Sequence, residues 1–316
     1  MSASLPAVLP HDPVIAGDDR LAPAAPQPGR ASLSRALGPL AAVYIIWGST
    51  YLGMRFALEG FPPLLLSGGR FIIAGAAVLA FVAARGGALP DRRQWKNIVP
   101  VGTLLLVCGN GFVALAQVHI GSGVAAVVVA TMPLWMGLFA IAAGERPSRR
   151  EWLGILLGFG AVALLSSGKD LRADVGATLF LLLAPLCWAA GSMLSRRTPP
   201  APAGLMAIAG AQMLAGGAVA LTIGLLLGER VVGMPGLRPL LAMGYLIVFG
   251  TIGFAAYTWL LRNVRPVLAT SYAFVNPLLA VMLGALLGGE ELGWSTLIAA
   301  PAVALAVALA VTARGR

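Results

Sequence analysis

The sequence has few charged residues: only 11% of its residues are Asp, Glu, Lys or Arg, whereas 59% are hydrophobic. A water-soluble domain needs polar faces on its helices, so this balance excludes most soluble folds. The mean hydropathy of +0.87 is typical of a chain that resides in a bilayer. We therefore expect an integral membrane protein with the lipid bilayer as its main partner.

Residues that perform chemistry are scarce as well. The chain has two cysteines and two histidines, and no His-Glu-x-x-His motif. An intramembrane hydrolase or protease would need a metal cluster, an acid pair or a nucleophile beside a base. We predict that the protein is not an enzyme and uses no metal or cofactor. Cys108 and Cys187 both fall in apolar stretches, where the expected role is a small buried hydrophobe rather than half of a disulfide.

Acidic residues are missing from the middle of the apolar stretches, because all twelve lie in the N-terminal segment, in expected loops or at helix ends. A proton-coupled exporter often has an intramembrane carboxylate whose pKa is raised by desolvation. His119, near the end of an apolar stretch, is the one substitute that could titrate near neutral pH. If such a chain moves a solute across the membrane, facilitated transport and proton antiport both stay open, whereas a large lipophilic cation would find no buried anion to pair with.

What the sequence does have is ten apolar stretches, each about long enough to cross the ~30 Å of bilayer hydrocarbon as a helix. They are continuous, rich in Leu, Ala and Gly, and lack the alternation of a membrane barrel, so helices are predicted. The fold class is an all-α polytopic membrane protein with ten transmembrane helices. The expected spans are 37–54, 63–84, 98–117, 121–143, 152–168, 175–194, 204–227, 239–261, 267–288 and 294–312.

Residues 1–36 have a different composition, with recurring prolines and few large apolar side chains. Proline interrupts helices, and a segment so poor in apolar residues cannot form a core. We expect a disordered cytoplasmic tail over 1–36. It lacks the basic start and the immediate apolar run of a secretory signal, so we expect the first span to be retained as a start-transfer helix.

The formal net charge of +10 invites the hypothesis of nucleic-acid binding, but the cations are sorted by membrane side. With the N-terminus inside, sixteen cations fall on the cytoplasmic face and five on the other. The positive-inside rule then places both termini in the cytoplasm, which requires an even number of spans. No nucleic acid is expected as a partner. The five outer cations are Arg55, Lys169, Arg172, Arg230 and Arg238.

The chain also shows an internal repeat. Trp47 and Trp188 occupy matching places in the first and sixth spans, and the stretch VAAVVVATMP at 124–133 aligns without a gap to LATSYAFVNP at 268–277. Five helices per copy is an odd number, so the second copy must enter the membrane from the opposite side. Such inverted repeats place a site between the copies and suit alternating access.

The repeat divides the chain into two units, 37–168 and 175–312. Each aligned stretch is followed by a Glu that ends a helix, Glu145 in the first unit and Glu290 in the second. A monomer and a dimer both fit this organisation, because ten helices are enough to enclose a pathway within one chain.

Six short motifs stand out along the apolar part of the chain: YIIWGSTY at 44–51, Pro62-Pro63, Arg70-Phe71, GNG at 109–111, VAAVVVATMP at 124–133 and ATSYAFVNP at 269–277. Together they resemble the EamA family of the drug/metabolite transporter superfamily. The resemblance covers about residues 37–312 and implies a ten-helix exporter of small metabolites in the bacterial inner membrane, similar to exporters of amino acids, including aromatic ones.

A polar group that faces lipid is costly, so polar and aromatic residues within the spans are candidates for lining a cavity. On the first span Trp47, Thr50 and Tyr51 share one helix face, and Trp188 with Ser192 takes the matching place on the sixth. For the Trp pair, the alternatives are lining a cavity and packing between helices.

Two further faces combine amide and phenol groups. Asn110 and Gln117 lie on one face of the third span, and Tyr272 and Asn276 lie on one face of the ninth. Amides in membrane helices contact substrates or bond neighbouring helices. Both roles are kept as hypotheses.

Arg70 is the one cation well inside an expected span, next to Gly68 and Gly69. Its guanidinium either pairs with a substrate carboxylate or extends outward to water and helix-end carbonyls. Trp135 and Tyr257 are candidates for stacking on an aromatic or cationic substrate, with ordinary packing as the alternative.

Pro133 and Pro277 occupy corresponding positions of the two repeats. Each removes a backbone hydrogen bond and can kink its helix, so both are predicted hinges. The resulting hypothesis is an inner-membrane transporter that exports small molecules, most plausibly aromatic or bulky neutral amino acids, by alternating access. The alternatives are a proton-coupled exporter of multiple drugs or cationic compounds and, less favoured, a channel.

Overall fold

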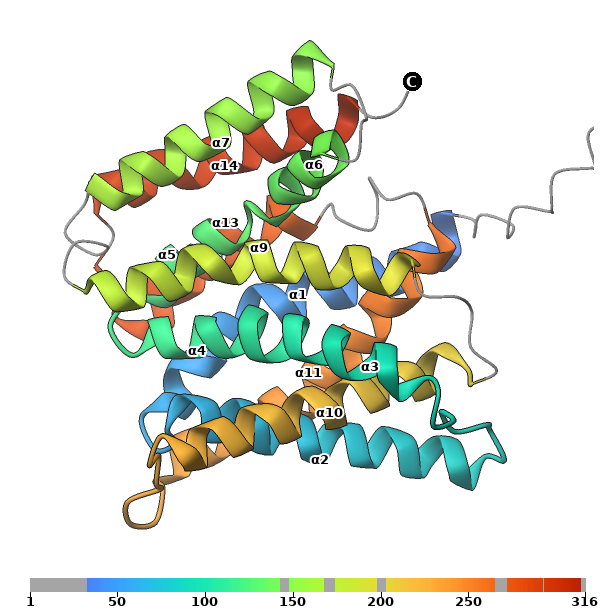
Figure 1. The fold of residues 1–316 in the computed structure, drawn as a ribbon. Coiled ribbons are helices and arrows are strands. Elements are labelled where there is room, and N and C mark those ends of the chain that lie inside the picture. The colour runs from blue at the N-terminus through green and yellow to red at the C-terminus, as the bar shows by residue number, and fades with distance from the viewer. Residues whose placement is uncertain are drawn as a thin grey trace, which may run out of the picture.

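The computed structural model describes residues 33–142, 148–167, 174–197, 203–264, 272–291 and 293–313, and these form helices and connecting turns without a strand (Figure 1). The helices are α1 (Leu33–Leu58), α2 (Pro63–Ala84), α3 (Trp95–Gly102), the π-helix η1 (Thr103–Gly111), α4 (Phe112–Gln117), α5 (Ser122–Val129), α6 (Met132–Ala142), α7 (Arg149–Ser167), α9 (Val175–Arg197), α10 (Leu205–Leu226), α11 (Leu237–Asn263), α13 (Tyr272–Gly288) and α14 (Trp294–Ala313).

The first helix begins at Leu33, earlier than the expected 37, because the residues after the last tail proline are compatible with a helix. Residues 1–32, which make up most of the predicted disordered tail, lie outside the described residues, and so does Glu145.

Within the described residues, seven helices are long and apolar enough to cross a membrane. Three shorter apolar helices, Trp152–Leu164, Val275–Gly288 and Trp294–Leu309, lie at the remaining expected spans. The prediction of an all-helical polytopic chain is therefore confirmed, while by length alone the helices establish seven crossings.

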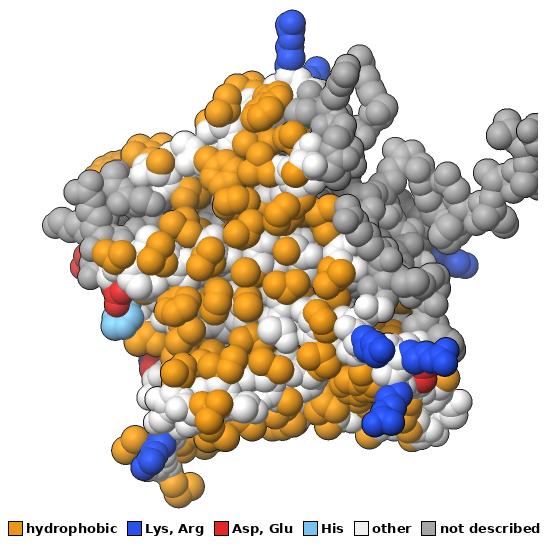
Figure 2. Space-filling view, in the orientation of Figure 1, with side chains coloured by type: hydrophobic (Ala, Val, Ile, Leu, Met, Phe, Trp, Pro, Cys, Tyr) orange, Lys and Arg blue, Asp and Glu red, His pale blue; other side chains and the backbone are white. Residues whose placement is uncertain are grey.

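The surface of the molecule is apolar where a soluble protein would be polar. Large side chains such as Leu156, Leu226 and Leu286 are exposed, and hydrophobic side chains cover the middle of the face in Figure 2 while the charged ones gather at its margins. Exposed apolar patches of this extent mark contact with lipid. The outside of the helix bundle is thus suited to hydrocarbon.

The two halves of the chain interdigitate rather than form separate bodies. Helix α1 packs against α11 and α13, α2 against α10, η1 against α9, and α7 lies beside α14 (Figure 1). Each of these pairs joins a helix from the first half to one from the second. The core of the molecule therefore lies between the halves.

Glycines permit the closest of these contacts. A Cβ built on Gly217 of α10 would lie 2.7 Å from the Ile72 nitrogen of α2, and one built on Gly68 of α2 would lie 2.6 Å from the Leu221 nitrogen of α10. Such backbone proximity is usual where small residues form a membrane helix interface.

Two of the expected spans depart from a regular α-helix. The third comprises α3, η1 and α4, so its middle is a π-helix, a form often found at functional sites. The fourth breaks between Val129 and Met132, directly before Pro133, and the Thr131 hydroxyl donates to the Val128 carbonyl at 2.7 Å. Pro277 lies inside α13.

Replacing Gly217 with Ala is expected to destabilise the protein by about 1 to 3 kcal/mol, because the new methyl group overpacks the α2 backbone. Gly244 of α11 has no atom within 4 Å of the position of its Cβ, so Gly244→Ala should be neutral or stabilising through its higher helix propensity. Melting temperatures of the detergent-purified proteins measure both. Equal melting temperatures would show that the α2 and α10 backbones are not in close contact.

Candidate functional site

An internal cavity of about 80 Å³ lies where the two halves cross. It is bounded by helices from both halves, and its polar and aromatic lining comes from α1, α2, η1, α9, α11 and α13. Apolar side chains complete the wall. The lining residues are Trp47, Thr50, Tyr51, Met54, Arg70, Phe71, Leu106, Gly109, Asn110, Val113, Val129, Met132, Trp188, Gly250, Phe254 and Tyr272.

Trp47 is the centre of an aromatic cluster at this cavity. Its ring centroid lies 5.7 Å from that of Trp188, 4.8 Å from Tyr257 and 5.0 Å from Tyr272. The contacts with Trp188 and Tyr272 are edge to face, with interplanar angles of 84° and 88°. This is a favoured geometry for aromatic pairs, because the positive edge of one ring meets the negative face of the other.

Two glycines allow the tryptophans to approach across the halves. A Cβ on Gly253 of α11 would lie 2.7 Å from the Trp47 indole nitrogen, and a Cβ on Gly109 of η1 would lie 2.7 Å from the Trp188 ring. Each tryptophan therefore packs on the backbone of a helix from the other half. This reciprocal contact fixes where both rings stand in the cavity wall.

Arg70 of α2 is buried at the cavity, with only 3% of its surface exposed. Its Nη2 donates to the Asn110 side-chain oxygen, and its guanidinium carbon lies 4.4 Å from the centroid of the Phe71 ring. The Nε–H has no hydrogen-bond partner. The guanidinium is thus turned inward, rather than extending to water at the helix end.

The charge of Arg70 is not neutralised by a neighbouring acid, because no Asp, Glu or His occurs among the described residues that line the cavity. Asn110 supplies a neutral oxygen only. The Trp188 indole N–H is a second buried donor without a partner. Buried donors are nearly always paired in proteins, so these two N–H groups, both on residues that line the cavity, are unsatisfied in this structure.

The structure gathers seven of the twelve predicted site residues around the cavity, namely Trp47, Thr50, Tyr51, Arg70, Asn110, Trp188 and Tyr272. Tyr257 adjoins them, because its ring contacts Trp47 and Tyr272. The predicted sharing of one face by Trp47, Thr50 and Tyr51 therefore brings all three to the same space.

The other four predicted residues stand elsewhere. Gln117 donates to the Tyr51 carbonyl at 3.0 Å, and the Asn276 amide lies 3.2 Å from the carbonyl oxygens of Tyr44 and Tyr272. These amides bond helix to helix. Trp135 packs edge to face on Phe159 at 4.9 Å, and Ser192 is buried one turn beyond Trp188 without lining the cavity.

Apolar lining residues escaped the sequence analysis because periodicity does not separate a cavity wall from core packing. Phe71, Leu106 and Val113 are examples, buried like any core residue. Phe254 had a usable signal, since its Gly-Phe pair at 253–254 repeats the Gly-Phe pair at 111–112.

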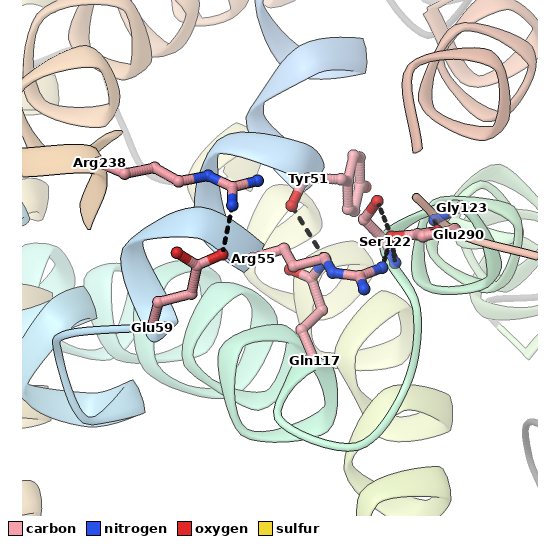
Figure 3. Close-up of polar contacts among 8 residues, drawn as sticks. All are labelled: Tyr51, Arg55, Glu59, Gln117, Ser122, Gly123, Arg238 and Glu290. Atoms are coloured by element: carbon pink, nitrogen blue, oxygen red, sulfur yellow. Dashed lines mark hydrogen bonds and ion pairs between the residues drawn. The ribbon is translucent and has the colours of Figure 1, made fainter. Parts of the chain in front are cut away.

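A polar cluster lies at one end of the cavity, where α1 ends and α5 begins (Figure 3). Glu290, between α13 and α14, forms an ion pair with Arg55 of α1. The same carboxylate accepts hydrogen bonds from the Ser122 N–H at 2.7 Å, the Ser122 hydroxyl at 2.6 Å and the Gly123 N–H at 3.1 Å. Glu290 therefore caps the N-terminus of α5, where a negative charge is favoured.

The pKa of Glu290 reflects these opposing influences. Burial of the carboxylate is the largest single influence, and it raises the pKa. The hydrogen bonds from Ser122 and Gly123 and the contact with Arg55 lower the pKa, and together they outweigh the effect of burial. The net result is a pKa below the ordinary glutamate value. Glu290 is therefore ionised at neutral pH and holds its partners as an anion.

His119, the other candidate for titration, lies apart from the cavity. Its side chain is half exposed, and its Nε2 lies 3.5 Å from the Asp174 carboxylate beside the start of α9. It does not contribute to the cavity wall.

Helices long and apolar enough to span a bilayer, enclosing a cavity with buried polar groups, define a polytopic membrane protein with an internal site. The sequence model of the EamA-like transporter family matches residues 37–167 and again residues 176–312. The chain belongs to the EamA-like transporter family, and it is a multi-pass transporter of the inner membrane.

Individual relatives agree with this assignment. The chain is 43% identical over 274 residues to "Uncharacterized inner membrane transporter YedA" of Escherichia coli (strain K12), which covers 86% of this chain and 89% of that protein. It is 26% identical over 281 residues to "Uncharacterized transporter sll0355" of Synechocystis sp., covering 80% and 82%. A solved structure, "Crystal structure of protein", superposes with a TM-score of 0.64 at 25% identity and covers 89% of this chain and 98% of that one.

Replacing Arg70 with Met is expected to leave the melting temperature unchanged or raised, because a buried cation without an acid partner is a net cost that an apolar side chain of similar length removes. Asn110→Leu should lower stability by about 1 to 3 kcal/mol, since it leaves the guanidinium without its hydrogen bond. Thermal unfolding of the two purified variants measures the contrast. A loss in Arg70→Met equal to that in Asn110→Leu would contradict this account.

Glu290→Gln should lower the melting temperature at pH 7, because the anion that pairs with Arg55 and the α5 N-terminus is lost. A pKa lowered by folding adds stability above the ordinary glutamate pKa, and this stability disappears as the pH falls through the folded pKa. The difference between parent and variant should therefore shrink below about pH 4. A difference that is constant from pH 7 to pH 3 would rule out the anionic role.

Proposed function

We propose that the protein is a carrier that exports small metabolites from the cytoplasm, with amino acids of aromatic or bulky neutral side chain as substrates, by alternating access to the central cavity. The observation that carries this proposal is Arg70, a buried guanidinium that faces the cavity without an acid partner beside an aromatic wall.

Arg70 favours a substrate with a carboxylate. Such a group could accept from the free Nε–H of Arg70 and from the Trp188 indole N–H, and it would neutralise the buried charge. A guanidinium offers a planar fork that matches a carboxylate in both spacing and direction. The Asn110 side-chain oxygen, on η1, accepts a hydrogen bond from the Arg70 guanidinium. Because this oxygen is neutral, it does not replace the negative charge that a substrate carboxylate would bring.

The aromatic cluster favours a substrate with an apolar or aromatic body. Trp47 and Tyr272 present ring edges and faces that suit an aromatic side chain, and neither carries a charge. The cavity of about 80 Å³ holds only a few water molecules, so an amino acid requires the surrounding helices to separate. Alternating access supplies that movement.

Two inverted repeats with ten crossings and both termini in the cytoplasm would provide the required geometry. The family description matches the chain twice, once in each half, which supports two repeats. The reciprocal contacts of Trp47 on Gly253 and Trp188 on Gly109 support a pseudo-two-fold relation between them. The excess of cations on one side supports the orientation.

Facilitated transport is favoured over proton antiport, because the described cavity lining holds no side chain that titrates between pH 5 and 8. The exporter of cationic drugs fits the cavity less well, since Arg70 would repel a cation.

Purified protein in liposomes tests the proposal through the flux of labelled Trp, Phe, Thr, phenylalanine amide and a quaternary-ammonium drug, with and without a pH gradient. Saturable flux of Trp and Phe that is indifferent to the gradient is expected. Phenylalanine amide, which lacks the carboxylate, should move at least about tenfold more slowly, as expected for the loss of a charge-assisted pairing. Movement of the drug alone, driven by the pH gradient, would overturn the proposal.

Three variants locate the site in the same assay. Arg70→Met should reduce amino-acid flux and abolish the preference for Phe over its amide, and Trp47→Ala should reduce flux of Trp more than flux of Thr. Trp294→Ala is the matched control, because Trp294 is exposed on α14 far from the cavity lining. If Arg70→Met retains the preference for Phe over its amide, the carboxylate is recognised elsewhere.

A further inference from the structure

The cavity is covered at one end by the cluster around Glu290. Tyr51 lines the cavity, and Arg55 lies one turn further along α1 on the same helix face. Val129 at the other end of α5 lines the cavity as well, whereas Ser122 at the start of α5 binds Glu290. The ion pair of Arg55 and Glu290 thus joins the end of α1 to the loop after α13 and, through Ser122, to the start of α5 (Figure 3).

Glu290 sits in a cradle that only glycines leave open. A Cβ on Gly284 would lie 2.7 Å from the Glu290 Oε2 atom, and Cβ atoms on Gly121 and Gly123 would lie 3.1 and 3.5 Å from it. Gly289, next to it, has φ of +61°, which turns the chain so that the carboxylate faces α5. The position of the carboxylate is therefore built by the backbone of several segments.

Helix α1 meets α13 and α4 at the same level. A Cβ on Gly288 would lie 2.9 Å from the Leu52 side chain, and Gln117 donates to the Tyr51 carbonyl at 3.0 Å. Opening the cavity at this end requires α1 to move away from α5 and α13. The contact between Arg55 and Glu290 is the ionic one that this movement would break.

The two partners of this ion pair are unequally held. Glu290 is 9% exposed and would keep its three hydrogen bonds to Ser122 and Gly123 if Arg55 left. Arg55 is 36% exposed and would regain water on leaving. Breaking the pair would leave the Glu290 carboxylate buried but still hydrogen-bonded, so its cost is smaller than that of a pair in which both partners are fully buried. An interaction with these properties is suited to being made and broken in every cycle.

We propose that Arg55 and Glu290 form a reversible latch that closes the cavity at the end where α1 meets α5 and α13. The latch rests on the proposed alternating access, and in the proposed orientation this end faces away from the cytoplasm. Glu290 is its fixed half, anchored to α5, and Arg55 is its mobile half, carried by α1.

A second ion pair at this end provides a matched comparison. Arg238 of α11 lies 3.3 Å from Glu59 after α1, but these side chains are 55% and 43% exposed. The Arg238 guanidinium also lies 3.7 Å above the Phe56 ring. Neither charge contacts a residue that lines the cavity, and exposed pairs contribute little.

Accessibility of a cysteine placed beneath the latch tests the proposal without requiring transport. Thr50→Cys lines the cavity five residues before Arg55 on α1, in a background with Cys108→Ala and Cys187→Ala. A membrane-impermeant thiol reagent is added to spheroplasts, to reach the outer face, and to inside-out vesicles, to reach the cytoplasmic face. The variants compared are Arg55→Gln, Arg55→Lys, Glu290→Gln and Arg238→Gln.

Arg55→Gln and Glu290→Gln should each raise the labelling rate from the outer face about three- to tenfold and lower it from the cytoplasmic face, because losing the pair shifts a two-state equilibrium. Arg55→Lys, which keeps the charge, and Arg238→Gln should stay within about twofold of the background. Rates that rise together on both faces would mean loosened packing, and unchanged rates in Arg55→Gln would mean that no latch exists; either result overturns the proposal. If the Glu290→Gln variant does not fold, the labelling rates of the Arg55→Gln variant alone test the latch. That variant still contains Glu290 with its hydrogen bonds to the start of α5.

The labelling assay tests the latch and the flux assay tests the substrate, so either proposal can be contradicted without the other. If the latch variants shift labelling while no amino acid moves, the latch stands and the substrate is wrong. If amino acids move in an Arg70-dependent way while labelling is indifferent to Arg55, the substrate stands and the latch is wrong. A shift with the two faces exchanged would keep the latch and reverse the proposed orientation.

Discussion

The constraint on which this structure depends is that hydrocarbon offers no hydrogen bonds. Every backbone polar group in hydrocarbon must be satisfied by the protein itself, so the chain is helical wherever it is apolar. The same constraint explains the glycines of α2 and α10, because helices in lipid associate through close packing rather than through hydrophobic burial. The exposed leucines on the outside need no partner but lipid.

Against this background the few polar groups inside the molecule are informative. The side-chain amides of Gln117 and Asn276 lie within hydrogen-bond distance of main-chain carbonyl oxygens and so join helices. Glu290 is surrounded by donors and caps α5. Arg70 differs from all of these, because it is buried beside a neutral partner with a donor left over. Ionisable groups inside a membrane protein often mark functional sites, which is why we propose the site at Arg70.

The candidate site could be predicted in part. Trp47, Thr50 and Tyr51 follow helical spacing, and a helix keeps such residues on one face wherever it packs. Trp135 was an equally reasonable candidate by composition, yet it packs on Phe159, because only the position of its helix decides what it meets. The inward turn of Arg70 depends likewise on Asn110 and Phe71, which lie on η1 and α2. The latch partners are 235 positions apart in sequence, Arg55 and Glu290, and no local pattern links them.

The sequence by itself determined the membrane location, the helical class and the family, because these follow from local composition, hydrophobic length and motifs that each segment carries independently. The tertiary structure alone decided which faces enclose the cavity, which of the polar residues bond helices instead, and that Glu290 meets Arg55 and Ser122. These depend on the relative placement of helices from the two halves. That placement arises from close packing at glycines, a property of pairs of surfaces that no single segment contains.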